Sequence, residues 1–216
     1  MKKLIIFSLF VLLCKFDYAQ NSYETEMKDG INLLFNAQTD ERLVFAAERF
    51  DHLSQTAKHE WLPLYYKGLT YTTLAFRTSD KEKRKKNIDN AQLAIDLAFK
   101  INSGESELFA LQGMIYEGLI TLDLYENGRI YLSKTTEVLN KAVELNPENP
   151  RAVYLQGLLA LYTPEVYGGG KESAYPILTK AQGLFEVFTP ETVFSPVWGA
   201  EDCNKMIATL KNLKTQ

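Results

Sequence analysis

One stretch of sequence decides the fold: LNKAVELNPENPRAVYLQGLLALYTPEVYGGGKESAYPILTKA, residues 139–181. Its first apolar residues recur at helical spacing, and Asn146-Pro147 predicts the end of that helix because proline cannot continue it. A second helix is predicted over residues 151–162, and a third carries Ala174. We expect Gly157 to lie opposite Ala174, because antiparallel helices approach closely only where small residues face each other.

The same order of landmarks recurs along the chain. A glycine in one helix is followed by a small-large-small run in the next. The glycines are Gly68, Gly113 and Gly157, and the runs are Ala91-Ile95-Ala98, Thr135-Leu139-Ala142 and Ala174-Leu178-Ala181. A weaker first copy has Gly30, Ala46 and Phe50. This pattern resembles the tetratricopeptide repeat (TPR) family, whose repeat is a helical hairpin with such landmarks.

The resemblance implies an all-α fold, a TPR-like right-handed helical solenoid of about four helix pairs with a C-terminal capping helix. The pairs are expected over residues 23–60, 61–103, 106–149 and 150–187, within a single domain over residues 20–216. Residues 188–216 form the expected capping segment, in which a helix from residue 200 would bury Met206, Ile207 and Leu210.

The repeats are longer than those of the family. Successive landmark glycines stand 45 and 44 residues apart, whereas the TPR period is about 34 residues. The extra residues fall between the two helices of each pair, and hence on one edge of the solenoid. They are either loops or longer helices. Insertions confined to one face often mark a binding face.

The N-terminus has the features of a secretory signal peptide over residues 1–19. Two lysines precede the apolar run, which is too short to span a bilayer, and Ala19 supplies a small residue for cleavage. Cys14 is not preceded by a small residue and so does not fit a lipoprotein site. We expect an exported protein, periplasmic or secreted, without a transmembrane segment. Cys203 is then the only remaining cysteine, which excludes an internal disulfide.

The charge pattern excludes one class of partner and marks two local features. The formal net charge of −3 gives no reason to expect nucleic acid as a partner. The basic run KEKRKK, residues 81–86, predicts either contact with phospholipid headgroups or an acidic partner, or merely a solvated helix start. The glycines at 168–170, followed by Lys171, predict either an anion site or a tight turn.

Nothing in the sequence indicates catalysis. The two histidines are His52 and His59, and Pro63 stands where the second histidine of an H-E-x-x-H zinc motif would be. No nucleophile elbow or nucleotide-binding loop is present either. We expect no enzyme activity, no metal and no cofactor.

The TPR resemblance implies that the concave wall is built from the first helix of each pair. Carried over by position, it predicts a groove lined by Tyr65, Leu69, Met114, Glu117, Tyr154, Leu158 and Tyr162. We therefore expect an adaptor for an unidentified protein or peptide, with a carrier of a small apolar ligand as the alternative. A narrower likeness is to TPR proteins associated with tripartite ATP-independent periplasmic transporters. If the rings of Tyr65 and Tyr154 prove enclosed, the groove hypothesis is wrong, and the KEKRKK edge or the Tyr167 loop is the next candidate.

Overall fold

The chain is a stack of antiparallel helices, described over residues 22–212 of the computed structural model. A first helix covers residues 22–35. The others are α2 (Asp40–Thr56), α3 (Leu62–Arg77), α4 (Lys81–Ile101), α5 (Ser106–Ile120), α6 (Glu126–Leu145), α7 (Pro150–Tyr162), the short 3-10 helix η1 (Glu165–Tyr167), α8 (Lys171–Val187) and α9 (Ala200–Asn212). Residues 22–212 contain no β-strand. The predicted all-α solenoid is confirmed, while the signal peptide and Cys14 lie outside the described residues.

Two of the landmark glycines, Gly113 and Gly157, make room for a large side chain of the paired helix. A Cβ placed on Gly113 of α5 would lie 2.5 Å from Leu139 Cδ2 of α6, and one on Gly157 would lie 2.5 Å from Leu178 Cδ2 of α8. The expected partner of Gly157 was Ala174, and this detail is wrong. Because the glycine faces the large residue of the small-large-small run, the two helices approach each other around a buried leucine.

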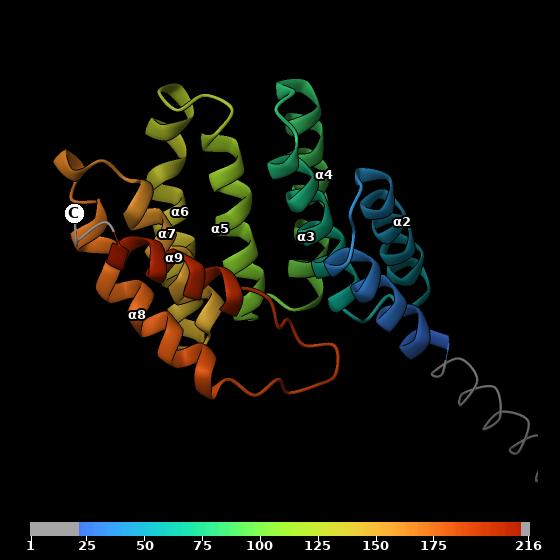
Figure 1. The fold of residues 1–216 in the computed structure, drawn as a ribbon. Helices are drawn as coiled ribbons and strands as arrows, with labels where there is room; N and C mark the ends of the chain where they lie inside the picture. Colours follow the sequence, from blue (N-terminus) through green and yellow to red (C-terminus); the bar gives the residue numbers. More distant parts are fainter. Residues whose placement is uncertain (1–21, 213–216) are drawn as a thin grey trace, which may run out of the picture.

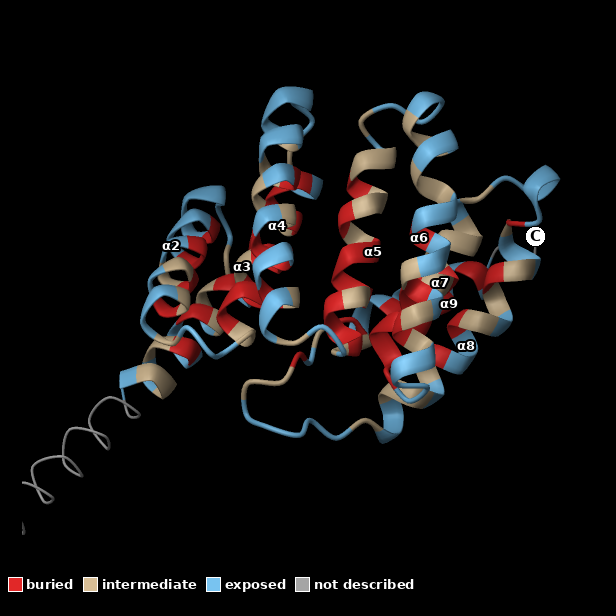
Figure 2. Ribbon diagram, turned by 180° about the vertical axis from the view of Figure 1, so that it is seen from behind, coloured by how far each residue is buried: buried red, intermediate tan, exposed pale blue. Residues whose placement is uncertain are grey.

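The first helices of the pairs form an inner layer and the second helices an outer one (Figure 1). α3 contacts α5 and α5 contacts α7, while each also packs on its own partner helix. Figure 2, seen from behind, shows the outer helices α4 and α6 with exposed outer surfaces and buried residues between the layers. The inner layer is therefore the wall that the TPR resemblance predicted to carry the groove.

The residues by which these repeats exceed the TPR length are accommodated in two ways. In the second pair they lengthen helices, because α4 has 21 residues and the joint before it is only residues 78–80. In the fourth pair they form a loop that includes η1. The backbone N–H groups of Gly168, Gly169 and Gly170 donate to the carbonyls of Glu165, Pro164 and Ala160. These donors are used within the turn, so the tight-turn interpretation holds and the anion site is wrong.

The last helix covers the end of the stack. α9 packs on α7 and α8 through Cys203, Ile207 and Leu210, which are buried among Tyr154 and Leu178. Met206 is partly buried beside them. The predicted capping helix is confirmed.

Candidate functional site

An extended segment crosses the inner layer between α8 and α9. We call residues 188–199 the strap. It leaves the end of α8, runs along the lower edge of the molecule in Figure 1 and returns to α9. Phe194 and Trp198 of the strap pack on the core cluster that runs from the first helix to α5.

Three aromatic residues fasten the strap to the inner layer. Trp198 Nε1 donates a hydrogen bond to Tyr65 Oη at 2.8 Å, and Tyr66 Oη donates to the Phe194 carbonyl at 2.8 Å. The ring of Phe188 lies 4.4 Å from the guanidinium carbon of Arg151, a cation–π distance. The strap therefore contacts both α3 and α7.

A buried ion pair lies beneath the strap. Arg151 Nε donates to both carboxylate oxygens of Glu107 at 2.9 Å, and Arg151 Nη2 lies 2.8 Å from Glu107 Oε1. Tyr65 Oη, 3.4 Å from Glu107 Oε2, joins this pair to Trp198. Burial and the Glu107 carboxylate raise the pKa of Tyr65, which keeps its hydroxyl available as a donor. The network links α3, α5, α7 and the strap.

Sequence reasoning missed Glu107 and Arg151. Both stand in the first turn of a helix, where charged residues are ordinarily solvated. The available signal was that first turns of successive inner helices stack, which brings a glutamate and an arginine 44 positions apart to the same level.

Three of the predicted groove residues are buried in the structure. Tyr65 is 0% exposed, Leu69 is 4% exposed and Tyr154 is 6% exposed. The rings of Tyr65 and Tyr154 are thus enclosed, the first by the strap and the second by α9 and its neighbours. All three residues were wrongly predicted as lining of an open groove, and segments outside the repeats cover the two tyrosine rings.

The other four predicted residues stay at or near the surface. Met114 and Glu117 on α5 and Leu158 on α7 are half-buried, whereas Tyr162 at the end of α7 is 73% exposed. Met114 and Leu158 pack on the same core cluster, and Glu117 and Tyr162 each follow one turn later on their helices. We call these four residues the inner-face site.

Glu117 gives this site a carboxyl group that is partly buried and has a raised pKa. Its Oε1 atom is buried and has no hydrogen-bond partner within residues 22–212. Burial raises the pKa of Glu117 to about 8, so the carboxyl is mostly protonated at neutral pH. The site is therefore mainly apolar and nearly uncharged, with the Glu117 carboxyl and the Tyr162 hydroxyl as its polar groups.

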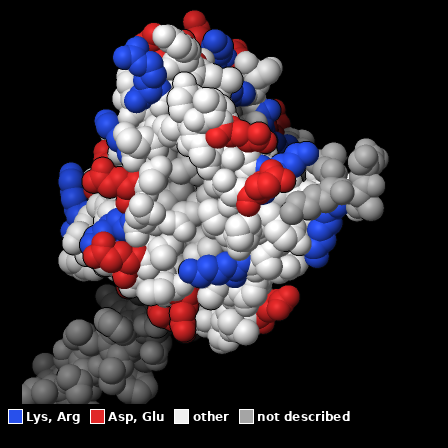
Figure 3. Space-filling model, turned by 90° about the vertical axis from the view of Figure 1, so that its left-hand side faces the viewer, with Lys and Arg blue, Asp and Glu red and all other residues white. Residues whose placement is uncertain are grey.

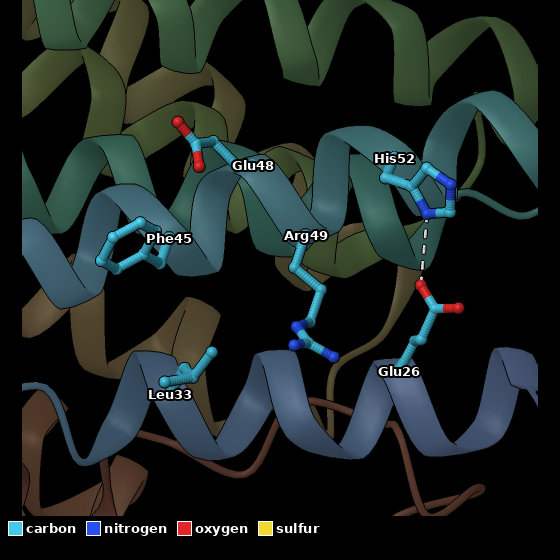
Figure 4. A pocket seen from close by; sticks show the side chains of 6 residues that line it. All are labelled: Glu26, Leu33, Phe45, Glu48, Arg49 and His52. Atoms are coloured by element: carbon cyan, nitrogen blue, oxygen red, sulfur yellow. Dashed lines mark hydrogen bonds and ion pairs between the residues drawn. The ribbon is translucent and has the colours of Figure 1, made fainter.

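A groove lies in the first helix pair, away from the inner-face site. The groove has a volume of about 730 Å³. Figure 4 shows the side chains that line it, which are Glu26, Leu33, Phe45, Glu48, Arg49 and His52. Arg49 Nη1 lies 3.2 Å from Asp29 Oδ2, and His52 Nδ1 lies 3.2 Å from Glu26 Oε2. Its basic side chains are thus engaged by the first helix, and these contacts hold the pair together.

Residues 22–212 contain no candidate for a metal centre or for a membrane span. No cluster of His, Cys, Asp or Glu there has the geometry to hold a metal ion. Within the same residues, every helix is too short or too polar to cross a bilayer.

The fold and the inner face define a helical protein of the TPR-like class. No protein-family model matches the sequence, and no curated protein matches it significantly. Among solved structures, the HusA haemophore from Porphyromonas gingivalis is similar, with a TM-score of 0.78 and 23% identity over 89% of this chain and 94% of that chain. A thermophilic TPR protein from Thermus thermophilus is similar with a TM-score of 0.56 and 16% identity over 90% of this chain and 93% of that chain.

Proposed function

We propose that the protein is a non-catalytic, extracytoplasmic carrier of a small, mainly apolar ligand held at the inner-face site. The observation that carries this proposal is the strap, which occupies the part of the inner layer where an extended peptide would lie. The surface left beside it is built from Met114, Leu158 and Tyr162, with the nearly neutral Glu117 among them. Such a surface favours a compact apolar ligand over a peptide.

Haem is the first ligand to test. The structural similarity to a haemophore extends over almost the whole of both chains. Met114 offers a thioether and Tyr162 a phenol, which are both known ligand types for haem iron. A protonated Glu117 adds no charge that would repel a carboxylate-bearing ligand. The site thus fits a flat apolar molecule with acidic groups at its rim.

Absorbance titration with haem at pH 7 tests the proposal. We expect a shifted Soret band on binding, and about tenfold weaker binding in Met114→Ala/Tyr162→Ala, from the loss of about 1.4 kcal/mol of contact. His52→Ala is the matched control and should bind as the wild type does. Loss of binding only in His52→Ala would move the site to the groove of the first helix pair.

The same titration should depend on pH. Above pH 8 Glu117 ionises and its charge opposes the carboxylates of haem, so affinity should fall between pH 7 and pH 9. In Glu117→Gln this fall should be absent. If haem does not bind at any pH, and native mass spectrometry of the purified protein finds no other small molecule, the carrier proposal is wrong.

The adaptor function remains the second candidate, supported by the similarity to a TPR protein. It requires the strap to leave the inner layer, because the strap's aromatic residues occupy that wall. A pull-down from envelope extract should then recover more partner with Trp198→Ala than with the wild type. Equal recovery from both would count against a partner in the strap region.

A further inference from the structure

The joints between paired helices carry several of the most exposed apolar side chains in residues 22–212. Leu124 and Tyr125 lie in the α5–α6 joint, and Val166 and Tyr167 lie in the α7–α8 joint, with exposed fractions between 72% and 82%. Figure 1 shows these joints at the same end of the helix pairs as the α3–α4 joint. Single exposed apolar residues need no explanation, but their grouping on one edge does. We call this end of the helix pairs the joint edge.

A basic segment adjoins these apolar tips. Lys81, Lys83 and Lys86 at the start of α4 are exposed, and no ion pair within residues 22–212 engages them. Arg84, by contrast, turns inward and donates from Nη1 to Thr121 Oγ1 at 3.2 Å. Because Thr121 begins the α5–α6 joint, this bond places the three lysines next to the tips of that joint.

The joint edge carries only a modest excess of positive charge. Asp80 caps α4 by accepting from the backbone N–H of Glu82, and Lys85 is paired with Asp89 at 2.6 Å. Figure 3, which views the end of the molecule at the α7–α8 joint, shows Lys and Arg interspersed with Asp and Glu around uncharged side chains. Charge alone therefore gives weak attraction, and stable contact needs the apolar tips as well.

We infer that the joint edge docks on an anionic phospholipid surface, with the apolar tips entering the headgroup layer and the lysines contacting lipid phosphates. The tips project from separate joints instead of lining a hollow, and a fluid surface accommodates such projections. Tyrosine is favoured at membrane interfaces because its ring is apolar and its hydroxyl polar. Clustered lysines attract anionic lipids. This docking is independent of what the inner-face site binds.

Tryptophan substitutions test which edge meets the lipid. The chain from residue 20 onward is used, so that the apolar leader cannot itself enter the bilayer, with vesicles containing about one third phosphatidylglycerol. Tyr125→Trp reports on the joint edge. Val193→Trp is the matched control, since Val193 is 77% exposed in the strap on the opposite edge. Brominated acyl chains should quench the tryptophan added in Tyr125→Trp about twofold and leave that added in Val193→Trp unchanged.

Charge reversal tests the lysines. Lys83→Glu/Lys86→Glu should weaken vesicle binding about tenfold, whereas Lys58→Glu/Lys100→Glu, on the opposite edge, should have little effect. Equal binding to pure phosphatidylcholine vesicles, or equal quenching in both tryptophan variants, would overturn the inference. Capture of an envelope protein by the joint edge without any vesicle binding would overturn it in favour of a protein partner.

Discussion

The carboxyl of Glu117 makes the stability of the protein depend on pH. Its pKa is about 8 in the folded chain because burial disfavours the ionised form. An exposed glutamate in the unfolded chain ionises near pH 4.3. The folded state therefore holds more protons between these values, and this residue's contribution to the free energy of unfolding falls as pH rises from about 4 to 8.

Replacing Glu117 should remove this dependence. Glu117→Gln keeps the shape but cannot ionise, so its melting temperature should exceed that of the wild type at pH 8 by several degrees, as a gain of about 1–2 kcal/mol produces. At pH 4.5 the two proteins should melt together. Thermal melts followed by circular dichroism at the two pH values measure this. A constant difference at both pH values would show that Glu117 acts through packing and not through its charge.

At the scale of elements, the strap is held by Trp198. Trp198→Phe keeps an aromatic ring but removes the N–H that donates to Tyr65 Oη, which should cost about 1 kcal/mol of unfolding free energy. Trp198→Ala should cost about 3 kcal/mol because packing is lost too. Urea denaturation measures both values. Val193→Ala, in the same strap, should change the free energy by less than about 0.5 kcal/mol, and a larger effect there would mean that the strap stabilises by chain rigidity.

The elements themselves were largely predictable from sequence, since the glycine landmarks and the Asn146-Pro147 stop depend on local chemistry. Ser106 shows the limit of such reasoning, because serine is a residue type favoured at N-caps. Glu105 caps α5, and the Ser106 hydroxyl donates instead to the Ala142 carbonyl at 2.8 Å. A tertiary partner 36 residues away outweighs the local capping preference. No pattern in the neighbouring sequence predicts this partner.

For the whole molecule, the strap joins repeats that would otherwise touch only their neighbours. It contacts the first helix through Tyr23 and Phe194, whose ring centroids are 6.0 Å apart, and it reaches α7 through Phe188 and Arg151. The groove hypothesis was wrong at Tyr65 because the strap, which is not part of any repeat, covers the ring. Repeat patterns predict the stack but not what a non-repeating segment does to it.

Removing the strap together with α9 should therefore reduce cooperativity. A chain ending at Val187 should unfold in urea with a lower m value and with separate transitions by circular dichroism and by the fluorescence of Trp61, as expected for nearest-neighbour coupling. The full chain should give one transition with both probes. Coincident transitions in the shortened chain would show that the helix pairs are coupled without the strap.

The hydrogen bond between Trp198 and Tyr65 spans 133 residues, in a fold whose other contacts are mostly local. During synthesis, Tyr65, Glu107 and Arg151 emerge long before the strap that covers them. The helix pairs can form in order as they appear, but the Tyr65 ring and the Glu107–Arg151 ion pair stay uncovered until residues 194–198 have been made. Because the strap can dock only on helix pairs that have already formed, its closure should be the last step of folding, and the interval before it is the one in which the nascent chain most needs a chaperone.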